Sequence, residues 1–251
     1  MTYSVNGGFG GAGGGGANHI VAHSESIGGG ATWHWTFPDG DDGTESVVGG
    51  APVDLADVVG YAPEPEGDAG TMNAILSTNS TQTGSIGASV RIQTAITVAA
   101  WVYRRQTQGT NVPIVGARVV GAGEANNIQW EMGIEATTNK IRSIWQNGAA
   151  DNTNILVASV GLAVDTWEHW TFTRNAAGTI SKLYKNGVLD ATSGTLIQAT
   201  GGTNVNRIHV GDNIAGAEFQ GHIKTPIIYE EELDAAEVLA LYNSTASNGS
   251  W

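Results

Sequence analysis

Cysteine is absent from this chain of 251 residues. Its absence excludes a disulfide-rich secreted scaffold, a thiol nucleophile and a zinc site built on thiolates. Basic residues are scarce as well: 11 Lys and Arg stand against 24 Asp and Glu, which gives a formal net charge of −13. This acidic balance argues against a broad basic face for nucleic acid or for an anionic membrane. We therefore expect neither as a partner.

Long hydrophobic runs are also missing. No segment approaches the ~20 apolar residues that a membrane-spanning helix requires. The N-terminal segment MTYSVNGGFGGAGGGG has neither the basic nor the apolar region of a secretory signal peptide. We expect the protein to stay inside the producing cell or to leave by a route that reads no such signal, such as virion assembly followed by lysis.

Residues 1–30 are dominated by glycine and contain few side chains that could pack. They are predicted to be either a flexible tail or an arm that orders only on a partner, which must then offset the ordering entropy. Residues 31–251 are predicted to form one domain. The arm residues that would contact a partner are Tyr3, Val5, Phe9, Ile20 and Val21.

Helical periodicity is nearly absent before the C-terminus, and turn residues recur throughout, which predicts an all-β fold. In residues 128–135, IQWEMGIE, apolar and polar residues alternate as in a half-buried strand. Asn186-Gly187 follows another strand and is the strongest short hairpin signal, because a type I′ turn requires positive φ at both central residues. The one predicted helix begins at Asp234, with Glu237 completing a capping box.

Several motifs occur in the order of a known family. Trp167-x-His169-Trp170, followed by the segment LYKNG at 183–187, resembles the core of concanavalin A-like jelly rolls of the laminin G-like type. Segments 96–102, 208–211, 219–223 and 233–243 resemble further landmarks of that family. The resemblance covers about residues 32–243. It implies an antiparallel jelly-roll β-sandwich with one short C-terminal helix and a structural role for His169.

The resemblance says little about function, since this fold hosts lectins, glycanases, adhesion modules and virion proteins. Jelly-roll glucanases carry an E-x-D-x-E strand, which Glu131-x-Gly133-x-Glu135 resembles without the central Asp. Glu131 and Glu135 would lie about 13–14 Å apart on a flat strand, whereas a retaining pair needs roughly 5–5.5 Å. We interpret them as a solvated outer face and expect no enzyme.

The six histidines are scattered without the spacing of a metal site. The acidic segment 39–43, DGDDG, could be a calcium loop or a solvated turn, and its spacing does not match an EF-hand. No cofactor is expected, and whether the segment binds calcium is left undecided by the sequence.

Two polar loops contain the groups of a sugar site, which combines an aromatic platform with amides and carboxylates. Trp145 could stack on a sugar or be a core residue of the strand at 141–145. The candidate residues of these loops are Trp145, Asn147, Asp151, Asn152, Asn154, Asp212 and Asn213.

These observations lead to a hypothesis and two alternatives. The hypothesis is a non-catalytic structural protein of the virion surface, a phage-type capsid decoration or fibre module that contacts other subunits or its own copies. The first alternative is an extracellular carbohydrate-binding adhesin or lectin that recognises a cell-surface glycan. A glucanase-like glycoside hydrolase is the more distant one.

Overall fold

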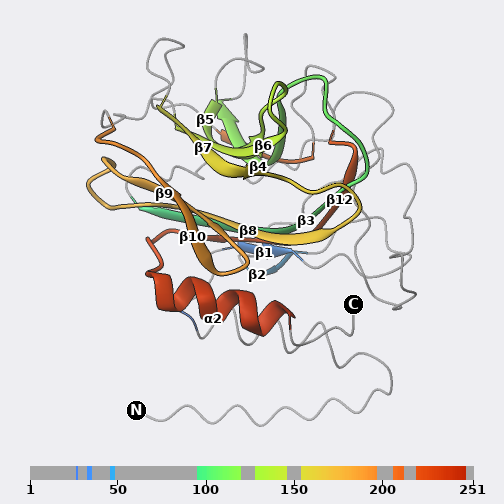
Figure 1. Ribbon diagram of the computed structural model, residues 1–251. Coiled ribbons are helices and arrows are strands. Elements are labelled where there is room, and N and C mark those ends of the chain that lie inside the picture. The colour runs from blue at the N-terminus through green and yellow to red at the C-terminus, as the bar shows by residue number, and fades with distance from the viewer. Residues whose placement is uncertain are drawn as a thin grey trace, which may run out of the picture.

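The computed structural model describes residues 27, 33–35, 46–48, 95–119, 128–145, 154–196, 206–211 and 219–246. Within these ranges, two antiparallel sheets stack face to face, and one helix lies against the outer face of the larger sheet (Figure 1). This arrangement confirms the predicted jelly-roll sandwich with a short C-terminal helix.

The larger sheet has seven strands in the order β10-β9-β8-β3-β12-β1-β2. At its centre, β3 (Ile96–Arg104) pairs with β8 (Trp167–Arg174) on one side and with β12 (Gly221–Tyr229) on the other. Every side chain of β3 is buried except the half-buried Tyr103, as its apolar residues at both parities predict. The other strands of this sheet are β9 (Ser181–Lys185), β10 (Val188–Thr192), β1 (Trp33–Trp35) and β2 (Ser46–Val48).

The smaller sheet has five strands in the order β11-β4-β5-β6-β7. Its central strand, β5 (Ile128–Ile134), is the strand with the clearest alternation in the sequence, and it pairs with β6 (Lys140–Trp145). The other strands are β4 (Val112–Val119), β7 (Asn154–Gly161) and β11 (Asn206–Val210).

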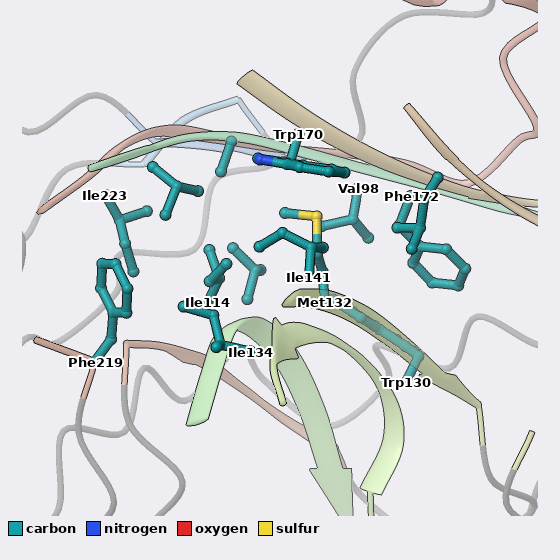
Figure 2. Close-up of a cluster of buried hydrophobic side chains, with 14 of the residues drawn as sticks. Val98, Ile114, Trp130, Met132, Ile134, Ile141, Trp170, Phe172, Phe219 and Ile223 are labelled. Atoms are coloured by element: carbon teal, nitrogen blue, oxygen red, sulfur yellow. The ribbon is translucent and has the colours of Figure 1, made fainter. Parts of the chain in front are cut away.

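The main core lies between the two sheets. Trp130, Met132 and Ile134 of β5 point toward Trp170 and Phe172 of β8, and all five are fully buried (Figure 2). Each buried side chain of this size contributes roughly 1.5–3 kcal/mol to stability. The period of two in β5 therefore predicted the inward face of the strand correctly.

The β9–β10 hairpin has the predicted turn. Asn186 has a φ of 49° and Gly187 a φ of 77°, so both central residues adopt the left-handed conformation of a type I′ turn. Asparagine tolerates this conformation better than other residues with a Cβ, and glycine adopts it without strain.

Helix α2 (Ala235–Ala246) also begins as predicted. Asp234 Oδ1 accepts hydrogen bonds from the backbone N–H groups of Ala236 and Glu237 at 2.8 and 2.9 Å, and Glu237 Oε2 accepts from Asp234 N at 2.8 Å. Val238 and Leu241 pack with residues on the outer face of the seven-stranded sheet, in a second cluster of buried side chains.

Two expectations lie outside the described residues: the arm contacts Tyr3, Val5, Phe9, Ile20 and Val21, and the acidic turn at 39–43. Of residues 1–30 only Ile27 is described, and it is buried. The division of the chain at residue 30 therefore stays a prediction. Among the described residues, no helix is long and apolar enough to cross a membrane.

Candidate functional site

Trp145 is a core residue. Its side chain is 3% exposed, and the guanidinium carbon of Arg174 lies 3.8 Å from the centroid of its ring. Asn154 is half-buried and donates to the carbonyl of Trp145 at 3.4 Å. A sugar platform must present a ring face to solvent, so the structure favours the core interpretation of Trp145. The other loop candidates lie outside the described residues: Asn147, Asp151, Asn152, Asp212 and Asn213.

Three aromatic side chains form a patch on the outer face of the seven-stranded sheet. Tyr103 of β3 is the register partner of both Trp167 on β8 and His222 on β12. The ring centroid of Tyr103 lies 5.4 Å from that of Trp167 and 5.4 Å from that of His222, and the latter two are 6.2 Å apart. We call these three residues the aromatic patch. Tyr103 and Trp167 are half-buried, whereas His222 is 2% exposed.

Polar groups surround the aromatic patch. The hydroxyl of Tyr103 donates to Asp165 Oδ1 at 3.4 Å. Gln106 Nε2 donates to Gln220 Oε1 at 3.2 Å, and the backbone N–H of Arg105 donates to the carbonyl of Gln220 at 3.0 Å. The hydroxyl of Tyr103 thus contacts a carboxylate, and two amides and the charge of Arg105 belong to residues within three positions of Tyr103 or His222; such groups bind sugar hydroxyls.

Burial and neighbouring charges determine the protonation states of His222 and Tyr103. Burial, and after it the charge of Arg105, lower the pKa of His222 to about 4, so this imidazole is neutral at neutral pH. Burial, followed by the Asp165 carboxylate, raises the pKa of Tyr103 above its usual value. The phenol therefore keeps its proton and can act as a donor at neutral pH.

A buried arginine holds the segment that carries Asp165 and Trp167. Arg104 donates through Nη2 to the carbonyl of Leu162 and through Nη1 to Asn139 Oδ1, the latter at 2.7 Å. The backbone carbonyls of Arg104 and Asn139 accept from Asp165 N at 2.8 Å and from Leu162 N at 3.0 Å. These bonds fix residues 162–165 against the end of β3, directly beside Tyr103.

The adjoining aromatic triplet is structural. Trp101, His169 and Tyr242 have ring centroids 5.3–5.8 Å apart, and α2 contributes Tyr242. His169 is 1% exposed, and burial lowers its pKa to about 3. A neutral, buried imidazole under the helix agrees with the structural role that the family resemblance implies.

The interpretation of Glu131 as a solvated residue is wrong. Its side chain is fully buried, and Oε1 accepts from Arg142 Nη2 at 2.9 Å. Arg142 stands opposite Gly133 in the register of β5 and β6, which places its guanidinium beside Glu131. The carboxylate can be buried here because the desolvation of a paired and hydrogen-bonded charge costs far less free energy than that of an isolated charge. Glu135 is half-buried and accepts from the hydroxyl of Thr138.

The described residues contain no group of three or more His, Asp or Glu side chains that could hold a metal ion. The aromatic patch offers stacking and hydrogen bonding. The patch could not be found from the sequence, because its members lie far apart in the chain. Even the nearest pair, Trp167 and His222, is separated by 55 positions. Only the register of β8, β3 and β12 unites them.

A model of the concanavalin A-like lectin/glucanases superfamily matches residues 76–239. No curated protein sequence matches the chain.

Among solved structures, the chain resembles Trypanosoma rangeli sialidase in complex with sialic acid, with a TM-score of 0.64 and 13% identity over 94% of this chain and 38% of the sialidase. It resembles the binding domain of Paraclostridial Mosquitocidal Protein 1 with a TM-score of 0.60 and 15% identity, over 85% and 52% of the two chains. It also resembles the CBM40 of Ruminococcus gnavus IT-sialidase bound to α2,3 sialyllactose, with a TM-score of 0.52 and 14% identity, over 60% and 83%. The chain spans about two fifths of the sialidase, and at these identities the likeness shows the fold alone.

Proposed function

The chain belongs to the concanavalin A-like lectin/glucanases superfamily, and from that premise we propose that it binds a glycan through the aromatic patch. The observation that carries this proposal is the pair of half-buried rings, Tyr103 and Trp167, in contact across adjacent strands beside Asp165. A sugar ring has an apolar face that stacks on aromatic rings and hydroxyls that bond to carboxylates and amides.

The structural neighbours support this class of function. One is a CBM40 bound to sialyllactose, and another is a sialidase in complex with sialic acid. These ligands belong to those proteins, and they support the proposal only as properties of proteins with a similar fold. The comparisons add no support for the virion hypothesis, so we prefer the carbohydrate-binding alternative.

We propose binding rather than catalysis. The carboxylate of Glu131 is buried and engaged by Arg142, and that of Glu135 accepts from Thr138. A glycosidase needs two carboxyl groups that are free to act on one glycosidic bond. The arrangement of Glu131 and Glu135 instead stabilises the five-stranded sheet and its turn.

A glycan array with the purified protein tests the proposal. The wild type should retain at least one class of glycan, and Trp167→Ala should weaken binding by about tenfold or more, the effect of removing a central aromatic contact. Tyr103→Phe keeps the ring and loses only the hydroxyl, so its loss should be smaller than that of Tyr103→Ala. Ile180→Ala, at an exposed position at the other end of the β8–β9 hairpin, is the matched control. Retention of no glycan by a folded wild type would refute the proposal.

A further inference from the structure

Arg174 places a cation inside the sandwich. It is the last residue of β8, on the same face as Trp170 and Phe172, and its side chain is 0% exposed. Its register partners are Ile96 on β3 and Ser181 on β9. Across the core, the ring of Trp145 lies under the guanidinium at 3.8 Å.

The hydrogen bonds of this guanidinium are incomplete. Nη2 donates to the carbonyl of Gly178 at 2.6 Å, while Nε and Nη1 have no partner. None of the ion pairs found in the described part of the chain includes Arg174. Burial lowers its pKa to about 10, which still leaves the group charged at neutral pH.

An uncompensated buried charge is strongly unfavourable, because its hydration is lost without replacement. A desolvated cation–π contact contributes about 2 kcal/mol, which offsets only part of that cost. The other two buried arginines among the described residues also have an unpaired Nε, but their remaining nitrogens have stronger compensation. Arg142 has the carboxylate of Glu131 as its counterion, and Arg104 has two oxygen acceptors.

We propose that Arg174 and Trp145 form a binding site for the oxygens of a small anionic group, either a carboxylate, a sulfate or a phosphate. The oxygens of the anion would accept hydrogen bonds from Nε and Nη1. These bonds would satisfy the remaining donors of the guanidinium, and the negative charge would balance its positive charge. The source of the group is either a free small anion or the acid group of an acidic sugar.

The site lies beside an exposed loop. The guanidinium is hydrogen-bonded to Gly178, in the β8–β9 hairpin, whose tip residues Ala176 and Ala177 are exposed. The site is separate from the aromatic patch, because Arg174 and Trp167 stand at opposite ends of β8, about 23 Å apart at 3.3 Å per residue. Trp145, a candidate glycan residue in the sequence, is here one wall of an anion site.

Thermal unfolding with increasing acetate, sulfate, phosphate or glucuronate tests the site, with chloride at matched ionic strength. The midpoint of the wild type should rise saturably, by roughly 5–10 °C at about a hundredfold excess over Kd, and Arg174→Met should show no such rise. Because sulfate stabilises proteins in general, only the difference between the two proteins counts. A response to glucuronate alone would identify an acidic sugar as the source, and a response to acetate or phosphate would identify a free anion.

Equal responses of the two proteins, or no saturable response of the wild type, would overturn the proposal. If Arg174→Met does not fold, the Nε–H signal of Arg174 in ¹⁵N-arginine-labelled wild type replaces it. That signal should shift saturably with the same anion and stay constant with chloride. A signal that does not move with any of the anions contradicts the site.

Discussion

Asn186 connects the β9–β10 turn to β8, and its replacement tests the fold at a single side chain. Its backbone has a φ of 49°, and its Oδ1 accepts from the backbone N–H of His169 at 2.8 Å. The backbone N–H of Asn186 also donates to the carbonyl of His169 at 2.7 Å, and replacement by Ala, Gly or Asp keeps that donor.

Asn186→Ala removes two favourable features at once. Alanine in the left-handed conformation costs roughly 1–2 kcal/mol, and a buried N–H left without its acceptor costs about 1–3 kcal/mol. We therefore expect a loss of about 2–5 kcal/mol in the free energy of unfolding. This exceeds the loss from the turn conformation alone, because the hydrogen bond to His169 adds to it.

Two further substitutions separate these contributions in a urea titration. Asn186→Gly removes the acceptor but adopts positive φ without strain, so it should lose less than Asn186→Ala. Asn186→Asp keeps an oxygen acceptor and tolerates the left-handed conformation, so it should stay within about 1 kcal/mol of the wild type. Equal losses for the Asp and Ala variants would refute the hydrogen-bond argument, and no loss for the Ala variant would refute the turn.

Three other predictions concern buried polar groups. Arg104→Gln should speed amide hydrogen exchange in residues 162–168 more than elsewhere, since the arginine holds that segment. Glu131→Ala should cost about 3–5 kcal/mol in urea, because Arg142 keeps a buried charge without its partner, and the double variant with Arg142→Met should recover part of that loss. The thermal midpoint should fall as the pH drops from about 6.5 to 4, since His169 and His222 bind protons more readily when unfolded. A flat profile in this range would contradict the lowered pKa values.

Local signals in the sequence were sufficient for most of the fold. The Asn186-Gly187 turn and the Asp234 cap depend on residues within a few positions of each other, and both are present in the structure. The alternation in β5 identified the inward face of the strand for the same reason.

The site depends on contacts that no local pattern encodes. Tyr103 and Trp167 meet only because β3 and β8 pair in one particular register. The burial of Glu131 follows from the position of Arg142 on the next strand. For Trp145, the sequence pattern did not decide which face of the strand is buried, and the burial of the ring against Arg174 shows that it is a core residue.

The indole N–H signals of tryptophan in a ¹H–¹⁵N correlation spectrum test the central claim, that the aromatic patch binds the glycan. Trp167→Phe and Trp145→Phe assign the two signals, and the glycan retained on the array is then titrated into the wild type. The account predicts a saturable shift of the Trp167 signal. A Trp167 signal that stays constant while the glycan binds would contradict the account.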